Sequence, residues 1–546
     1  MGAGPYPRDF LTLLTMHLKT GYKLLLLVFS PSLPALALSV VGPTADLIVS
    51  NVVLAPDGVS RLAAVANDVH PGPLIKASKG DRFNLNVINN LTDEHDNDTS
   101  IHWHGFFQRG TTWADGAEGV SQCPIPTGSS FLYNFTGGDQ AGTYWYHSHV
   151  GVQYCDGLRG PIVVYDDNDP YKADYDIDDE NTVITLADWY HVPSRNVGLN
   201  GAAAEANSTL INGLGRYPGG PRTTLAVFNV EKDKRYRFRL VSLSCDPNFN
   251  FTIDGHNLTV IEADGQLVKP VVVDQIQIFA GQRYSFILVA NQTESNYWIR
   301  AQPNVGFGDL ENIVTGGINS AILHYVGAPD VEPPDPELPL PVPKLPLLEP
   351  SLHPFSDEIA EELTRDPDFS MVLNIGRTTP PNPVFTINGV PWTVPPMPIM
   401  LQILSGAQNV SELMPQGSIY ELQRGWIVEL TVPRFAIGAP HPFHLHGHAF
   451  SVVKSASSQT PNLINPVRRD VVSTGGGAGE TTVIRFVADN PGPWIFHCHI
   501  EFHLRDGLAI VFAEAFDEIE AANPVPQSWR DICQAFKAAH PTRISA

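Results

Sequence analysis

Short stretches in which apolar and polar residues alternate recur along the chain, each after a turn-like segment. Three of them are residues 83–87 (FNLNV), 236–240 (YRFRL) and 426–430 (WIVEL). Alternation with a period of two is typical of half-buried antiparallel strands, in which one face packs on the core and the other meets solvent. The pattern predicts an all-β protein.

A glycine-containing segment with a histidine follows each of these strands. The three segments are residues 101–105, 253–256 and 443–447. The first and third also share an ending, because a glycine lies five residues before both His147 and His497. An Asp-Gly-Leu sequence then begins seven residues after both His149 and His499. We interpret the chain as three copies of one domain.

Aligned on these shared residues, the copies differ in their candidate metal ligands. The first copy has Ser148 at the position of Cys498, Gln153 at that of His503 and Thr99 at that of His441. The middle copy has residues 298–302 (WIRAQ) where a histidine pair would fall, so we expect it to bind no metal there. Such selective loss is hard to explain if the histidines were only structural.

The length of 546 residues suits about three domains of ~150 residues each. A proline-rich stretch cannot form a central strand or a helix, and we expect it to be a stiff, extended linker. The predicted organisation is a signal peptide at 1–37, a first domain at 38–168, a second at 169–327, the linker at 328–350 and a third domain at 351–546.

Composition narrows the class of protein further. Charged residues make up only 17%, whereas 45 glycines and 47 prolines favour strands and turns over long helices. The net charge of -23 argues against nucleic acid as a partner, since phosphate would be repelled. After the N-terminal segment, no apolar run approaches the ~20 residues needed to cross a bilayer. We expect a monomer that binds neither nucleic acid nor membrane.

The N-terminal segment indicates secretion. Lys19 and Lys23 precede an apolar run at 24–29 and small residues that end in an A-x-A cleavage site at Ala37, and Met16 would make a more ordinary signal start than Met1. We therefore expect a secreted, extracellular glycoprotein. Its N-x-S/T sequons are Asn90, Asn97, Asn134, Asn207, Asn250, Asn257, Asn291 and Asn409.

The cysteine count points to one special thiol. An odd number in a secreted protein leaves one cysteine unpaired. Cys498 has a histidine on each side, so we expect it to be the exception and the other four to form two disulfides. The five cysteines are Cys123, Cys155, Cys245, Cys498 and Cys533.

Four His-x-His pairs carry the candidate chemistry. In an extended segment both histidines of a pair project to the same side, so eight imidazoles could hold several metal ions. Cys498 lies within the fourth pair, and His441 and His503 lie nearby. One thiolate and two imidazoles form the trigonal ligand set of a blue copper site, which indicates a redox enzyme. The pairs are His102 and His104, His147 and His149, His444 and His446, and His497 and His499.

The longer motifs around these residues resemble the multicopper oxidases, and within them the laccases of basidiomycete fungi. The matching segments are residues 102–108, 113–116, 142–149, 441–448 and 497–503. The likeness covers nearly all of the chain after the signal. It implies three cupredoxin-like Greek-key β-sandwich domains, in agreement with the triplicate pattern.

The resemblance also implies four copper ions with defined ligands. His441, Cys498 and His503 would bind the type 1 copper, and His102 and His444 the type 2 copper. It further implies disulfides Cys123–Cys533 and Cys155–Cys245. His70, His256 and His448 are interpreted as ordinary or hydrogen-bonding histidines. The ligands implied for the type 3 pair are His104, His147, His149, His446, His497 and His499.

The axial position of the type 1 copper should be Leu508, ten residues after Cys498. There is no methionine after Met414, so an axial methionine of the usual kind is absent. An aliphatic neighbour does not coordinate and donates nothing to Cu(II), so the oxidised form is destabilised. We predict a high reduction potential, and Leu508 can be a core residue at the same time.

Three carboxylates and two copper ligands are the candidate catalytic residues. By resemblance, Asp115 could relay protons to the copper cluster. Glu501 is a second candidate, with a solvated surface charge as its alternative. Asp246 matches the acidic residue that accepts a hydrogen bond from the donor in related laccases, with a turn cap ahead of Pro247 as its alternative. Cys498 and His503 would carry the electron from donor to cluster.

The resemblance therefore implies one-electron oxidation of phenols and aromatic amines, coupled to four-electron reduction of O2 to water, with a possible role in lignin degradation. The first alternative is another oxidase of the family, such as a ferroxidase or an ascorbate oxidase. The second is a non-catalytic copper-binding protein, which should often contain methionine-rich tracts. The whole chain has only 6 methionines, and these do not form such a tract.

Overall fold

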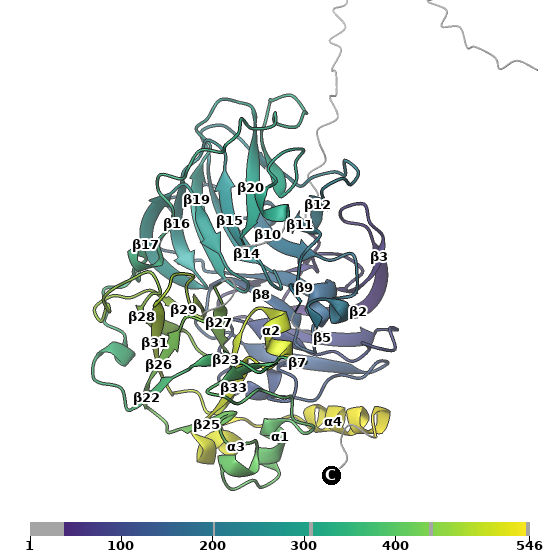
Figure 1. The fold of residues 1–546 in the computed structure, drawn as a ribbon, viewed down its shortest axis with the longest axis vertical. Helices are drawn as coiled ribbons and strands as arrows, with labels where there is room; N and C mark the ends of the chain where they lie inside the picture. The colour runs from purple at the N-terminus through teal and green to yellow at the C-terminus, as the bar shows by residue number, and fades with distance from the viewer. Residues whose placement is uncertain (1–37, 200–201, 305–308, 380, 436–439, 542–546) are drawn as a thin grey trace, which may run out of the picture. The chain divides into compact units, whose positions relative to one another are not determined.

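The computed structural model describes residues 38–199, 202–304, 309–379, 381–435 and 440–541. The predicted signal peptide at 1–37 lies outside the described residues. The described residues all belong to one compact unit. Figure 1 shows that the unit consists of strands with a few short helices, which confirms the all-β prediction.

The first domain pairs a four-stranded sheet (order β3-β2-β5-β7) with a five-stranded sheet (order β1-β4-β9-β8-β6). The alternation predicted at 83–87 lies in β5, where residues facing the core alternate with partly exposed ones. The strands are β1 (Val40–Val41), β2 (Thr44–Leu54), β3 (Arg61–Ala66), β4 (Leu74–Ser78), β5 (Arg82–Asn90), β6 (Ile101–His104), β7 (Ser130–Thr136), β8 (Gly142–Ser148) and β9 (Arg159–Tyr165).

The second domain pairs a seven-stranded sheet (order β12-β11-β10-β14-β19-β16-β17) with a five-stranded one (order β13-β21-β20-β15-β18). Its strands are β10 (Val183–Trp189), β11 (Ser208–Ile211), β12 (Leu214–Arg216), β13 (Val227–Val230), β14 (Arg235–Ser242), β15 (Asn248–Ile253), β16 (Leu258–Ala263), β17 (Gln266–Val273), β18 (Ile276–Ile278), β19 (Arg283–Val289), β20 (Asn296–Asn304) and β21 (Ser320–Tyr325).

The third domain has two five-stranded sheets (orders β22-β26-β31-β28-β29 and β25-β33-β32-β27-β30) and a two-stranded one (β23-β24). Its strands are β22 (Phe369–Val372), β23 (Ile375–Arg377), β24 (Phe385–Ile387), β25 (Ile419–Leu422), β26 (Ile427–Pro433), β27 (Pro442–Leu445), β28 (Phe450–Lys454), β29 (Arg468–Arg469), β30 (Val471–Ser473), β31 (Thr481–Val487), β32 (Gly492–Cys498) and β33 (Ala509–Glu514).

The helices are few and short. The α-helices are α1 (Ile399–Leu404), α2 (Glu501–Arg505), α3 (Ile519–Ala522) and α4 (Gln527–Ala539). The 3-10 turns are η1 (Thr112–Ala114), η2 (Gln153–Asp156), η3 (Glu180–Thr182), η4 (Ser194–Asn196), η6 (Asp309–Asn312), η7 (Glu349–Ser351), η8 (Glu361–Leu363), η9 (Val410–Glu412) and η10 (Phe516–Glu518). Within the described part of the chain, no helix has the length and apolarity that a membrane span requires.

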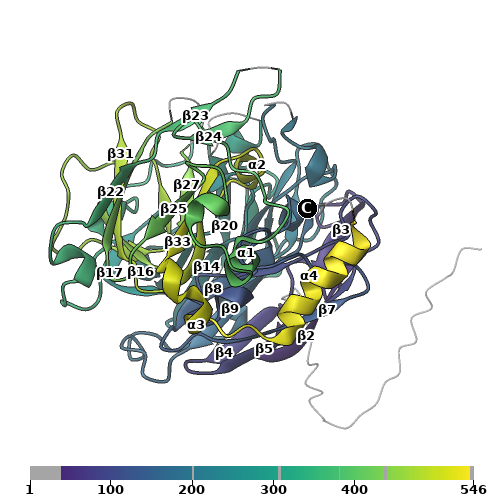
Figure 2. The ribbon, with the colours of Figure 1, turned by 90° about the horizontal axis from the view of Figure 1, so that it is seen from below.

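The two ends of the described chain are tied together. Helix α4 packs on the first domain (Figure 2), where Trp529 and Phe536 join the core that contains Phe131. A disulfide connects Cys123 with Cys533, and a second connects Cys155 with Cys245, which is the pairing that the resemblance implies. The third domain therefore cannot separate from the first without unpacking this helix.

The proline-rich stretch contains no strand and no α-helix in the structure, as predicted, although η7 begins near its end. It lies along the second domain instead of spanning free space. The indole nitrogen of Trp298 donates to the carbonyl of Pro334 (2.8 Å), and the backbone of Lys344 donates to Asp274 (2.7 Å). These contacts hold the linker in an extended course over the sheet.

Candidate metal centre

The four His-x-His pairs converge between the first and third domains. Strand pairing sets each pair beside its neighbour, since His102 is opposite His147 and His444 is opposite His497. Imidazole rings of the first domain then stack on imidazole rings of the third. His102 stacks on His446 and His104 on His444, each with ring centroids 3.8 Å apart. All eight imidazoles are buried.

Among the groups that the potential ligand atoms form, three consist of histidines from these pairs, each with all its members within 4.8 Å of one another. Two groups contain three histidines that the resemblance implies for the type 3 pair. The third joins His102 and His444, the implied type 2 ligands, with His104. The groups are His104, His147 and His499, then His149, His446 and His497, then His102, His104 and His444.

Hydrogen bonds on the far side of the ring fix which nitrogen of His102 and of His444 faces the cluster. Nδ1 of His102 donates to the carbonyl of Asp115 (2.7 Å), and Nδ1 of His444 to that of Asp470 (2.8 Å). Their Nε2 atoms, like those of His147 and His149, are buried without a hydrogen-bond partner. An unsatisfied buried polar atom is costly, so this convergence fits a bound metal.

Burial also keeps four of the imidazoles neutral. It lowers the pKa of His147, His444, His446 and His497 well below the usual value, and the neighbouring histidines lower it further. A neutral imidazole has the free lone pair that a metal requires, so the chemistry of the donor set fits copper.

Cys498 forms a second centre with two histidines. Its sulfur lies 3.5 Å from Nδ1 of His441 and 3.7 Å from Nδ1 of His503, and these two nitrogens are 3.2 Å apart. Burial raises the pKa of the Cys498 thiol well above its usual value, so a thiolate here depends on a bound cation. Leu508 is fully buried beside it, and its carbonyl accepts from the backbone N–H of Cys498 (3.1 Å).

The first domain retains the shape of the Cys498 centre without its chemistry. The side-chain oxygen of Gln153 accepts hydrogen bonds from the hydroxyls of Thr99 and Ser148, each at 2.7 Å. These are the residues that the sequence alignment places at the positions of His503, His441 and Cys498. In the first domain, hydrogen bonds between neutral side chains therefore replace the proposed metal ligands of the third. The first and third domains are thus related in structure as well as in sequence.

The histidines interpreted as ordinary are engaged elsewhere. His256 contacts the hydroxyl of Tyr325 (2.7 Å), His448 lies 2.9 Å from Glu514, and His70 lies 3.2 Å from the carbonyl of Gly157. In the middle domain, Arg300 stands where a histidine pair would fall and donates two hydrogen bonds to Asp254 (3.0 and 2.8 Å).

Asp115 and Glu501 are both buried near the histidines. The Asp115 carboxylate accepts from Nδ1 of His446 (2.8 Å) and lies 3.3 Å from Nδ1 of His102. Glu501 is 2% exposed, so its alternative interpretation as a solvated surface charge is wrong. The cause is its place on the first turn of α2, which packs against the second domain at Cys245. Burial raises its pKa well above the usual value.

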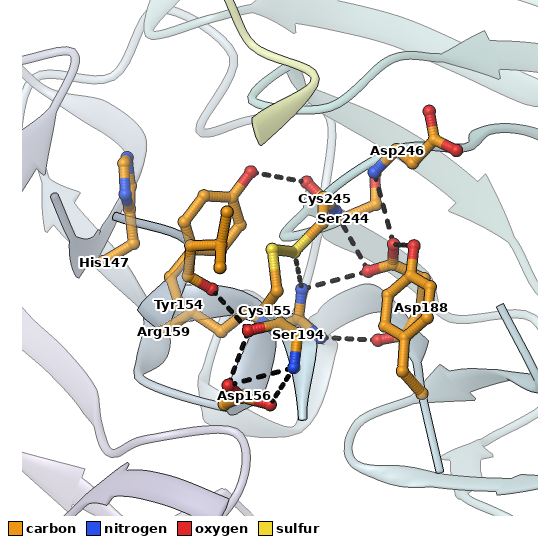
Figure 3. Close-up of a disulfide and its surroundings, with 12 residues drawn as sticks. His147, Tyr154, Cys155, Asp156, Arg159, Asp188, Ser194, Ser244, Cys245 and Asp246 are labelled. Carbon is orange, nitrogen blue, oxygen red and sulfur yellow. Dashed lines mark hydrogen bonds and ion pairs between the residues drawn. A yellow bond between two sulfur atoms is a disulfide. The ribbon is translucent and has the colours of Figure 1, made fainter. Parts of the chain in front are cut away.

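Asp246 lies on the loop that follows the Cys155–Cys245 disulfide. Figure 3 shows its carboxylate pointing away from Asp188, whose own carboxylate accepts from the Asp246 backbone (3.2 Å). Burial, together with the charge of Asp188, raises the pKa of Asp246 to about 8. The backbone N–H of Glu501 donates to the carbonyl of Cys245 (2.9 Å), which brings this loop beside α2 and His503.

Sequence reasoning missed several residues that shape the two centres. Asp470 of the third domain contacts His104 and is held by Arg283 of the second domain. The ring of Phe385 lies 4.4 Å from that of His503. Tyr154 places its hydroxyl 3.4 Å from Nδ1 of His499. None of them belongs to a histidine motif, so no local spacing marks them.

Comparisons with known proteins agree with this arrangement. Three family models, each described as multicopper oxidase, match residues 49–169, 180–328 and 392–518. Each match falls, to within one residue, inside one predicted domain, and the boundaries themselves stay predictions. The chain is 54% identical to a laccase of Trametes hirsuta (93% of this chain, 96% of that one) and 52% identical to one of Phlebia radiata (93% and 96%).

Solved structures share the fold. The laccase from Botrytis aclada superposes with a TM-score of 0.78 at 30% identity, covering 93% of this chain and 94% of that one. Fet3p, a multicopper oxidase that functions in iron import, superposes with a TM-score of 0.78 at 28% identity, covering 90% and 95%.

The chain belongs to the multicopper oxidase family, and its three β-sandwiches are the cupredoxin domains of that family. Within the family it is a laccase, with copper as its cofactor. The resemblance drawn from the sequence is thereby confirmed.

Proposed function

We propose that each copper ion is held by the ligands that the motifs imply. His441, Cys498 and His503 would hold the type 1 ion, with Leu508 as a non-coordinating axial neighbour. His102 and His444 would hold the type 2 ion, and the other six histidines the type 3 pair. The observation that carries this proposal is the division of the type 3 histidines into two groups of three. Copper bound there supplies reversible one-electron redox chemistry.

The Cys498 centre and the histidine cluster are joined through the end of strand β32. His497 and His499 flank Cys498 directly, so an electron taken up at the thiolate has a covalent path through the backbone to two ligands of the cluster. This connection supports one-electron oxidation of a donor at one site and four-electron reduction of O2 at the other.

The donors we propose are phenols and aromatic amines that reach the edge of His503, which is partly exposed. Asp246 would accept the proton of the phenol as its electron leaves. A carboxylate with a pKa of about 8 is a much stronger base than an ordinary aspartate, so the proton transfer is favourable when it is ionised. Cys498 and His503 carry the electron inward.

The protons that oxygen reduction consumes need a route from within the protein. Asp115 contacts His102 and His446 and is our first candidate for that relay. Glu501, buried on α2 next to His499 and His503, is the second. Both carboxyls lie where bulk water cannot deliver a proton directly.

We also propose that the protein is a secreted, monomeric glycoprotein. Its two disulfides suit an oxidising compartment. Five of the sequon asparagines are exposed and three are partly buried. The exposed ones are Asn90, Asn207, Asn257, Asn291 and Asn409; the others are Asn97, Asn134 and Asn250. Glycopeptide mass spectrometry and light scattering of the secreted protein test these points.

Oxygen uptake by the copper-loaded protein tests the donor class. We expect uptake with a dimethoxyphenol, together with a strong red absorption band from the Cys498 thiolate. Fe(II) is the comparison donor, because Fet3p shares the fold and functions in iron import. Uptake with Fe(II) but not with the phenol would favour a ferroxidase. Absence of the band at full copper loading would refute the Cys498 centre.

A further inference from the structure

One exposed cation stands at the entrance to the Cys498 centre. Arg377 ends β23, and its guanidinium carbon lies 5.0 Å from the ring centroid of Phe385. The Phe385 ring lies 4.4 Å from the ring of His503. In series, the two contacts place the guanidinium within about 9 Å of His503, which is within the Debye length at moderate ionic strength.

The backbone fixes Arg377 at this place. In the antiparallel pair β23-β24, Arg377 is directly opposite Phe385, so the two side chains share one face. The hairpin is in turn attached to the end of α2, because the backbone N–H of Phe385 donates to the carbonyl of Asp506 (2.7 Å). Trp392 makes a similar bond to Gly507 (2.9 Å). The position of Arg377 relative to His503 is therefore a property of the fold.

The other arginine near His503 is already neutralised. Arg505 donates to the carboxylate of Asp506 (2.8 Å) and to the carbonyl of Val197 (2.9 Å). Arg377, in contrast, forms no ion pair among the described residues. In a chain with a net charge of -23, the rim of the donor site thus carries a local positive charge that is free to meet an anion.

We propose that Arg377 selects donors that carry a carboxylate on the aromatic ring, such as hydroxybenzoates and hydroxycinnamates. This inference rests on the proposed oxidation of phenols at His503. The phenol end would face His503 and Asp246, while the carboxylate points outward to the guanidinium. A planar guanidinium can pair with a carboxylate through two hydrogen bonds, so Arg377 would orient the donor as well as attract it.

The test compares two phenolic donors, one charged and one neutral, that share the same ring substitution pattern. Syringate carries a carboxylate opposite its phenol, and methyl syringate carries the neutral ester at the same position. The ester withdraws electrons more strongly than the carboxylate, so each variant is compared with the wild type on the same donor. We measure oxygen uptake by the copper-loaded protein for the wild type, R377A and R377K, at low and high salt.

In R377A we expect KM for syringate to rise about five-fold, the upper end for one exposed ion pair, with kcat unchanged. KM for the methyl ester should stay within about two-fold, because the ester has no charge to lose. R377K should restore part of the difference between the two KM values. High salt should reduce the preference of the wild type for syringate over its ester.

Lys232→Ala is the matched control, because it removes one exposed cation from the β13-β14 turn of the second domain. It should change neither KM. If R377A changes KM for syringate and its ester in the same proportion, or changes neither, Arg377 does not select for charge. If the wild type shows no oxygen uptake with any of these donors, the proposed oxidation of phenols is wrong, and this inference fails with it.

Discussion

His104 turns its Nε2 atom toward the carboxylate of Asp470, 3.3 Å away, and presents Nδ1 to the cluster, 3.3 Å from Nε2 of His499. His102, His147, His444, His446 and His497 are anchored the opposite way, through Nδ1. The carboxylate that holds His104 is itself held by Arg283 of the second domain through two hydrogen bonds (2.6 and 2.7 Å). A domain that contributes none of the proposed ligands thus orients one of them.

Replacing Arg283 with methionine should disturb the type 3 copper pair. Asp470 would lose both hydrogen bonds, and His104 its fixed orientation. We expect a weaker near-ultraviolet band of the type 3 pair and a lower copper content, with the red band of the Cys498 centre retained. Absorption spectra and metal analysis measure both.

Arg300→Met is the matched control for Arg283. Arg300 is also buried and forms a two-bond pair with Asp254. Breaking the buried Arg283–Asp470 pair should cost about 3–5 kcal/mol of stability, and breaking the Arg300–Asp254 pair should cost less, because the Asp254 side chain is 40% exposed. If Arg300→Met changes the copper spectrum as much as Arg283→Met does, the effect is one of general destabilisation.

Asp115→Asn should slow turnover while leaving the fold intact. The amide keeps the shape and can still accept from His446 through its oxygen, but it cannot relay a proton. We expect kcat to fall by about a hundred-fold, the lower range for loss of a general acid–base group, with a changed solvent isotope effect. Asp115→Glu should recover part of the rate. Normal turnover in Asp115→Asn would remove Asp115 from the proton route.

Leu508→Met should lower the reduction potential of the type 1 copper. Leu508 is fully buried next to Cys498 and offers no lone pair, whereas a thioether can donate weakly to Cu(II) and stabilise it. A redox titration of the red band measures the shift. The rate with donors that are hard to oxidise should fall more than the rate with easy ones. An unchanged potential would show that residue 508 does not face the copper.

Asp96 should make stability depend on pH. Burial, together with the charges of Asp156 and Asp93, raises its pKa to about 7, whereas an unfolded aspartate titrates near ~3.9. The folded state therefore binds the extra proton between these values. The contribution of Asp96 to the free energy of unfolding is complete below pH ~4 and is lost as the pH rises through about 7.

Unfolding by denaturant at both ends of this range, for the wild type and Asp96→Asn, isolates the contribution of Asp96. The variant should lose less stability than the wild type as the pH rises. Asp176→Asn is the contrasting control, because hydrogen bonds from Arg235 lower the pKa of Asp176 to about 2 and its effect should therefore have the opposite sign. Parallel curves for wild type and Asp96→Asn would contradict the prediction.

The sequence by itself determined the class of fold and the set of candidate ligands. Strand alternation and His-x-His spacing are local properties, since a period of two fixes which side chains share a face. The replacement of His441, Cys498 and His503 by Thr99, Ser148 and Gln153 was also visible without coordinates. The structure shows these three residues hydrogen-bonded together.

Only the tertiary structure decided which groups meet across domains. Asp470, Arg283 and Arg377 lie far from any histidine motif in sequence, and contacts such as Arg283 with Asp470 or Phe385 with His503 span long separations. The burial of Glu501 likewise follows from packing of α2 against another domain. Residue type and spacing describe what a side chain can do, but its partners and its burial are set by how the domains pack.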